Sequence, residues 1–260
     1  MIALKAGVNY LKRAFCSYIL ILILVLGPLF QTFLVKSNIS AISKGIDNLE
    51  GRHTILVPLE QLRSTNLEQL VAASTLAYFL MLTGLIMVNL NVSDRRNNTL
   101  MRIYSTPVKR RWINTGYVLA QTLASMLIAA IYIVSSSVLF GINWGKSLQG
   151  LAIVTLFASL LSVSCSFVLA AMFKTPKTAV GAVTFILFVI AFLSDTFTLG
   201  GQLDGISKFT VNKWIYEAYL SIMQGNSVSS ILGNLGVLMG TAVVFLFLGS
   251  ILYGRGQSYE

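Results

Sequence analysis

Long apolar runs separated by short polar loops dominate the pattern along the 260 residues. A helix needs about 20 mostly apolar residues to cross roughly 30 Å of hydrocarbon. Six runs meet this requirement without Lys, Arg, Glu or His, and Asp195 lies only at the last turn of the fifth. These predicted spans are residues 16–35, 70–92, 117–140, 148–173, 178–197 and 231–253. The pattern predicts an all-α membrane protein in which residues 1–260 form a single transmembrane domain of six transmembrane helices.

The residues before the first span show helical periodicity. Apolar side chains recur on one face, at Leu4, Val8, Leu11 and Phe15. Polar and basic side chains occupy the neighbouring face, at Lys5, Asn9, Lys12 and Arg13. This pattern predicts that residues 1–15 form an interfacial amphipathic helix whose basic face meets anionic headgroups. A plain flanking segment is the alternative.

The first apolar run could also be read as a secretory signal, because basic residues precede it. However, the run continues past Pro28 to residue 35, and no small-residue cleavage site follows. A membrane span is therefore the prediction.

Composition and charge support a lipid environment. Hydrophobic residues make up 55% and charged residues 11% of the chain, with a mean hydropathy of +0.77, whereas soluble domains have about 25% charged residues. This composition excludes an ordinary soluble enzyme, a disordered chain and a nucleic-acid-binding domain, despite a net charge of +10. Twelve of the 19 Lys and Arg residues, but only two acids, fall on the side that carries both termini. The bias predicts cytoplasmic termini and a multi-pass protein of a bacterial plasma membrane.

The loop at residues 93–112, on the same predicted side, combines arginines with apolar residues. Leu100, Ile103 and Tyr104 share a helical face, and the helix is expected to end shortly before Pro107. A basic loop lying on lipid explains the arginines but not this apolar face. The pattern therefore predicts a short helix that docks on a protein partner. The candidate contact residues are Thr99, Leu100, Met101, Arg102, Ile103, Tyr104, Ser105 and Pro107.

The segment at residues 198–230 contains an apolar, aromatic run that is too short to span. We expect it to re-enter the membrane or lie in its outer interface, with Trp and Tyr at headgroup depth. Glu217 is a functional candidate there, although pairing with Lys213 one turn earlier is an equal alternative. The candidate residues are Trp214, Tyr216, Glu217 and Tyr219.

The chain offers little chemistry of its own. It has one histidine, His53, and the two cysteines, Cys16 and Cys165, are interpreted as small apolar side chains. The segment 141–147 lacks the glycine spacing of a phosphate-binding loop and is interpreted as a tight turn. We expect no catalytic residue, no metal site, no nucleotide site and no bound cofactor.

Weakly polar and small residues are the main feature inside the spans. Ser159, Ser162 and Ser166 share one face of the fourth span, and Gly236 and Gly240 form a small-residue pair in the sixth. Close helix packing explains these residues. The alternative for the three serines is that they line a pathway for an amphipathic substrate.

Two segments carry a family resemblance. Residues 98–108, Asn-Thr-Leu-Met-Arg-Ile-Tyr-Ser-Thr-Pro-Val, and residues 214–219, Trp-Ile-Tyr-Glu-Ala-Tyr, resemble motifs of ABC-2-type exporter permeases. Asn98 and Met101 stand where that family usually has Gly and Glu. The resemblance implies that residues 98–105 form a coupling helix seated on a separate ATPase subunit. The N-terminal helix would brace the same ATPase subunit. It further implies two copies of the ATPase subunit, which hold ATP and Mg, and a second permease subunit, identical or homologous. The pathway would lie between the second and fifth spans of the two permease subunits.

The sequence thus predicts a permease subunit of an ATP-driven exporter of hydrophobic or amphipathic substrates, such as a drug, peptide, lipid or lipid-linked glycan. Two alternatives remain open. One is a self-contained channel or ion-coupled carrier, and the other is a non-transporting membrane scaffold or immunity protein.

Overall fold

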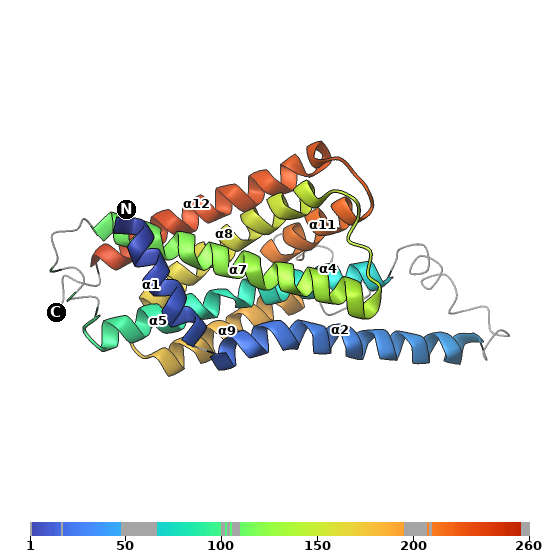
Figure 1. The fold of residues 1–260 in the computed structure, drawn as a ribbon, viewed down its shortest axis with the longest axis horizontal. Coiled ribbons are helices and arrows are strands. Elements are labelled where there is room, and N and C mark those ends of the chain that lie inside the picture. The colour runs from blue at the N-terminus through green and yellow to red at the C-terminus, as the bar shows by residue number, and fades with distance from the viewer. Residues whose placement is uncertain are drawn as a thin grey trace.

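The fold is a helical bundle, seen in a computed structural model that describes residues 2–16, 18–47, 67–99, 102, 105, 110–194, 207 and 210–255 (Figure 1). The helices are α1 (Ile2–Cys16), α2 (Tyr18–Asp47), α4 (Leu67–Leu82), α5 (Gly84–Arg96), α7 (Arg110–Phe140), α8 (Leu148–Met172), α9 (Pro176–Leu193), α11 (Val211–Met223) and α12 (Leu232–Arg255), with a 3-10 turn η1 (Val228–Ile231). The all-α prediction is confirmed.

Six stretches within these helices are long and apolar enough to cross a membrane. They are Ile19–Ser37, Glu68–Arg96, Trp112–Phe140, Leu148–Met172, Pro176–Leu193 and Ser229–Leu252, so the six predicted spans are confirmed with small shifts at their ends. The start of α1 and the end of α12 lie at the same end of the bundle (Figure 1), as an even number of spans requires. We call this the basic end, because Lys12, Arg96, Lys174 and Lys177 are exposed there.

The first two spans differ from the prediction in detail. α2 continues as a helix to Asp47, well past the expected end at residue 35. The second span is interrupted at Thr83, which separates α4 from α5. No glycine or proline signal indicated the length of α2, since Pro28 lies inside this helix without ending it. Gly84 directly follows the interruption at Thr83, but glycine is common inside transmembrane helices and did not by itself indicate a break.

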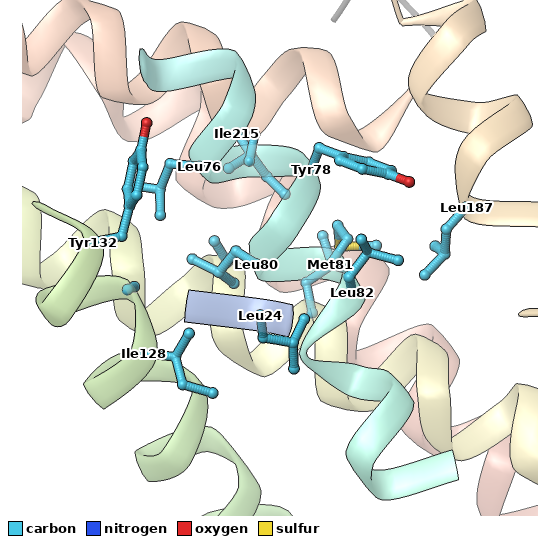
Figure 2. Packing of buried hydrophobic residues seen from close by; sticks show 14 of the residues in the cluster. Leu24, Leu76, Tyr78, Leu80, Met81, Leu82, Ile128, Tyr132, Leu187 and Ile215 are labelled. Atoms are coloured by element: carbon cyan, nitrogen blue, oxygen red, sulfur yellow. The ribbon is translucent and has the colours of Figure 1, made fainter. Parts of the chain in front are cut away.

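The second span forms the centre of the bundle. Over an 18-residue apolar stretch of this span 94% of the positions are buried within the chain, against 17% and 22% for the corresponding stretches of the first and fifth spans. Figure 2 shows α4 side chains, among them Leu76 and Leu80, between Ile128 and Tyr132 of α7 and Ile215 of α11. A pathway between the second and fifth spans of two permease subunits stays a prediction. Unlike the second span, the fifth span, α9, presents an open apolar face, with Phe185, Phe188 and Phe192 exposed.

The turn between α7 and α8 has a larger packing role than the sequence indicated. Trp144 is buried, donates its indole N–H to Ser136 Oγ at 3.0 Å, and contacts Tyr132 and Tyr219 edge to face. Gly145 has φ +83°, and a Cβ there would lie 2.6 Å from the Ile222 carbonyl oxygen. Residues 141–147 are a turn between α7 and α8, and through Trp144 this turn also links α7 to α11.

Candidate functional site

The last turn of α5, which leads into the predicted coupling loop, is tied to α1 by an ion pair. Asp94 is 1% exposed, and both of its carboxylate oxygens accept from the Arg13 guanidinium, one of them from Nη1 at 2.8 Å. The hydrogen bond to Asp94 raises the pKa of Arg13, and partial burial opposes this only in part. We expected Arg13 to face lipid headgroups together with Lys12. Lys12 is exposed, whereas Arg13 is half-buried and its guanidinium is bonded to Asp94.

Arg95, the next residue, ties α5 to α8. Its guanidinium donates to the carbonyl oxygens of Ala170 and Ala171 in the last turn of α8. These carbonyls have no partner within their own helix, and a cation near a helix C-terminus is favourable. We call the group of Arg13, Asp94, Arg95 and the two alanine carbonyls the α5 clamp. It joins three helices at the point where the loop begins.

Asn98 begins the segment that resembles the family motif. Its φ is +54°, the left-handed region in which Gly is favoured and Asn is the best-tolerated other residue. The Asn98 N–H donates to Arg95 O at 3.1 Å, and the Arg102 N–H donates to Asn98 O at 3.3 Å. Asn98 therefore ends α5 and opens a new helical turn, which explains how Asn can replace the usual Gly.

Substitutions at Asn98 should follow this geometry. We expect Asn98→Gly to keep wild-type stability within about 0.5 kcal/mol, whereas Asn98→Val should lose about 1–2 kcal/mol, because a β-branched residue is strained at positive φ. Limited proteolysis of the loop in detergent-solubilised protein checks this. Equal cleavage rates for the Gly and Val variants would contradict it.

The other predicted coupling residues are described only in part. Thr99 is half-buried, Arg102 and Ser105 are exposed, and Ser105 Oγ donates to Arg102 O at 2.8 Å. Leu100, Met101, Ile103, Tyr104 and Pro107 lie outside the described residues.

The N-terminal helix packs on the bundle through small residues and Tyr10. Gly7, Tyr10 and Ala14 are buried against the bundle, and α1 crosses α7 where Gly7 meets Gly116 (Figure 1). Of the predicted apolar stripe, Val8 is exposed and Leu11 half-buried. The side chains of Leu4, Lys5 and Phe15 lie outside the described residues.

The predicted re-entrant residues lie on α11, which packs against α4, α8 and α12. Tyr219 is fully buried and shares a 2.9 Å hydrogen bond with Thr155 Oγ1, and its position at headgroup depth stays a prediction. Trp214, Tyr216 and Glu217 are half-buried. Lys213 donates to Ser207 Oγ at 2.8 Å.

The three serines of the fourth span are buried against the second span. Ser162 Oγ donates to Met81 O at 3.0 Å, and Ser166 packs so closely on Gly84 that a Cβ there would lie 1.8 Å from Ser166 Oγ. Ser159 Oγ is buried without a hydrogen-bond partner. This is the arrangement that close helix packing requires, and pathway lining stays a prediction.

Sequence reasoning missed a polar cluster that surrounds the interruption at Thr83. Gln121 of α7 donates from Nε2 to Thr83 O at 2.8 Å and accepts from Tyr10 OH at 3.1 Å. Ser125 Oγ lies 2.7 Å from Thr83 Oγ1. Among the described α7 residues 117–137, Gln121 is the one amide side chain. An isolated amide inside an apolar span was the sequence signal that could have indicated this polar cluster.

Chemistry for catalysis is not evident in these residues. Among the described ranges, no group of three or more His, Cys, Asp or Glu side chains could hold a metal ion. The arrangement can transmit force, because the α5 clamp fixes the start of the loop at the basic end to three helices.

The comparisons with known proteins agree with this architecture. Residues 30–251 match the family model described as ABC-2 family transporter protein. The chain is similar to the linearmycin resistance permease protein LnrN of Bacillus subtilis (strain 168), with 29% identity over 189 residues. That alignment covers 68% of this chain and 47% of the relative, so the chain spans about half the relative's length. From the six apolar helices and the match over most of its length, the chain belongs to the ABC-2 family of transporter proteins, as a multi-pass membrane protein.

Proposed function

We propose that this chain is the permease subunit of an ATP-driven exporter, energised by a separate ATPase subunit that binds ATP and Mg. The observation that carries the proposal is the α5 clamp. A force applied to the loop after Asn98 would pass through Asp94 to α1 and through Arg95 to α8, so the loop can move the bundle as a body.

The substrate class follows from the exposed surfaces. The described spans carry no Lys or Arg between their ends, and the open face of α9 is aromatic. Such a surface suits a hydrophobic or amphipathic molecule, and the similarity to a permease named for resistance to an antibiotic supports export. A second permease subunit, identical or homologous, would complete the pathway.

Docking of the loop is tested with the double variant Leu100→Asp and Tyr104→Asp. We expect normal membrane insertion but loss of ATPase co-purification, because two carboxylates would stand in the apolar contact. The matched control is Ser137→Asp and Asn143→Asp, which adds the same charge at exposed positions of the opposite end. Unchanged co-purification of the loop variant would contradict the proposal.

Reconstitution separates the alternatives. The exporter requires the ATPase and ATP for substrate movement in proteoliposomes. Transport by this chain alone would show a channel or ion-coupled carrier. No movement with the ATPase bound and hydrolysing ATP would show a scaffold or immunity protein.

A further inference from the structure

The interruption of the second span is built from matched hydrogen bonds. Near Thr83, three backbone carbonyls accept from side chains: Leu80 O from Thr83 Oγ1 at 2.6 Å, Met81 O from Ser162 Oγ at 3.0 Å, and Thr83 O from Gln121 Nε2 at 2.8 Å. Leu80 O and Thr83 O also accept from the backbone N–H groups of Thr83 and Ile86, both at 3.2 Å, whereas Met81 O accepts from the Ser162 side chain. Backbone groups freed inside a membrane need such partners, because hydrocarbon offers no water to bond with them. The interruption is therefore a supported feature of the span.

Gln121 bonds both to the interruption and to helix α1. It is fully buried, and its amide joins two elements that are far apart in sequence. Its N–H₂ group binds the interruption at Thr83, while its carbonyl oxygen accepts from Tyr10 of α1. Tyr10 lies one turn before Arg13, which is bound to Asp94 at the end of α5. Helix α1 is thus linked to the middle of the second span through Gln121 and bonds directly to its basic end through Arg13.

We propose that the second span bends at Thr83–Gly84 and that Gln121 is a positioning residue, which sets the bend and links it through Tyr10 to the movement of α1. The two contacts of α1 make this possible. If α1 and the end of α5 move together as one body, the Tyr10–Gln121 bond carries that movement to the interruption. The angle between α4 and α5 then follows the position of α1. Only the transport and nucleotide readouts below depend on the function proposed above.

The bend is measured as a distance between spin labels at Glu68→Cys and Arg96→Cys, with Cys16 and Cys165 replaced by Ala. Glu68 and Arg96 are exposed and lie at the two ends of the second span, about 42 Å apart along a helix of this length. The subunit is reconstituted alone in lipid nanodiscs. We expect one narrow distance distribution for the parent chain.

Three variants test whether the side-chain amide of Gln121 sets the bend. Gln121→Met keeps the side-chain size but loses both hydrogen bonds, so the distribution should broaden. Gln121→Glu should stay narrow, because a buried, neutral carboxyl group can donate to Thr83 O and accept from Tyr10 OH. Thr122→Val is the matched control, since Thr122 is buried one residue away and bonds only to Val118 O of its own helix. A narrow distribution for Gln121→Met, or an equally broad one for Thr122→Val, would overturn the inference.

The link to α1 is tested in the complex with the ATPase, with and without ATP and vanadate. Tyr10→Phe removes one hydroxyl and leaves Gln121 bound to Thr83. We expect its nucleotide-free distribution to stay narrow while the nucleotide-induced shift falls below about half of the parent's value. Transport should fall about tenfold in Gln121→Met and stay within about twofold in Thr122→Val. A full nucleotide-induced shift in Tyr10→Phe would overturn the link. The nanodisc experiment on the subunit alone needs no ATPase, so a failure of the proposed function leaves the bend testable.

Discussion

Arg13→Met should lower the free energy of unfolding by about 3 kcal/mol, the lower end of the cost of leaving a buried charge without its partner. Asp94 is 1% exposed, so it cannot recover solvation when the guanidinium is removed. Met keeps the apolar stem of Arg13, so packing along α1 is little changed. Steric trapping in bicelles measures the unfolding free energy, and hydrogen exchange of the α1 amides should rise in the same variant.

Replacing the acid of the ion pair should lower the free energy of unfolding less than replacing the arginine. Arg13 is 41% exposed, so in Asp94→Asn the guanidinium can turn to water and still donate to the amide oxygen, and we expect a loss of about 1 kcal/mol. The double variant should be more stable than Arg13→Met alone, because the stranded carboxylate is gone. Lys12→Met, on the exposed side of α1, is the control and should stay within about 0.5 kcal/mol. An Asp94→Asn loss larger than that of Arg13→Met would refute this account of the ion pair.

Gly84→Ala should cost up to about 3 kcal/mol, the upper end for overpacking a core. The added methyl group would lie 1.8 Å from Ser166 Oγ, 2.9 Å from Ser166 Cβ and 3.0 Å from the Ser162 carbonyl oxygen. The hydroxyl can rotate away, but the Cβ and the backbone cannot, so α5 and α8 must separate. The midpoint of thermal unfolding in detergent, followed by fluorescence-detected size-exclusion chromatography, should fall clearly.

A second substitution tests this cause. Ser166→Gly removes the two nearest atoms, so Gly84→Ala with Ser166→Gly should recover much of the loss. Gly236→Ala is the matched control, because nothing lies within 4 Å of a Cβ at that exposed position of α12. Equal destabilisation by Gly84→Ala and Gly236→Ala would show that helix propensity or lipid contact, and not the contact with Ser166, controls the effect.

The apolar pattern predicted the six spans because hydrocarbon thickness imposes a minimum length on every one of them. It did not predict the interruption at Thr83, because its one local signal, Gly84, is a residue that is frequent in transmembrane helices. Gln121 and Ser162 donate to Thr83 O and Met81 O from 38 and 81 residues away in the chain. The pattern around Thr83 could not show these distant partners. The isolated Gln121 showed that something polar lay inside the bundle, but not with which helix it would pair.

The faces through which short helices pack on the bundle could not be predicted from the sequence. The apolar stripe of Leu4 and Val8 on α1 indicated contact with the membrane interface, but not that the helix packs through Gly7 and Ala14. In lipid, large apolar side chains gain little by turning inward, whereas small residues allow two backbones to approach closely. The burial of Tyr219 was equally hidden, because its hydroxyl bonds to Thr155 on another helix.

The near-complete burial of the second span has a consequence for how the protein is made. This span leaves the ribosome before α7 and α8, so Thr83 and the carbonyls beside it must enter the bilayer before Gln121 and Ser162 exist. A nascent chain cut off ahead of α7 would therefore hold Met81 O in hydrocarbon without its Ser162 donor, and Thr83 O without Gln121. The second span should need shelter by the insertion machinery until the third and fourth have been synthesised.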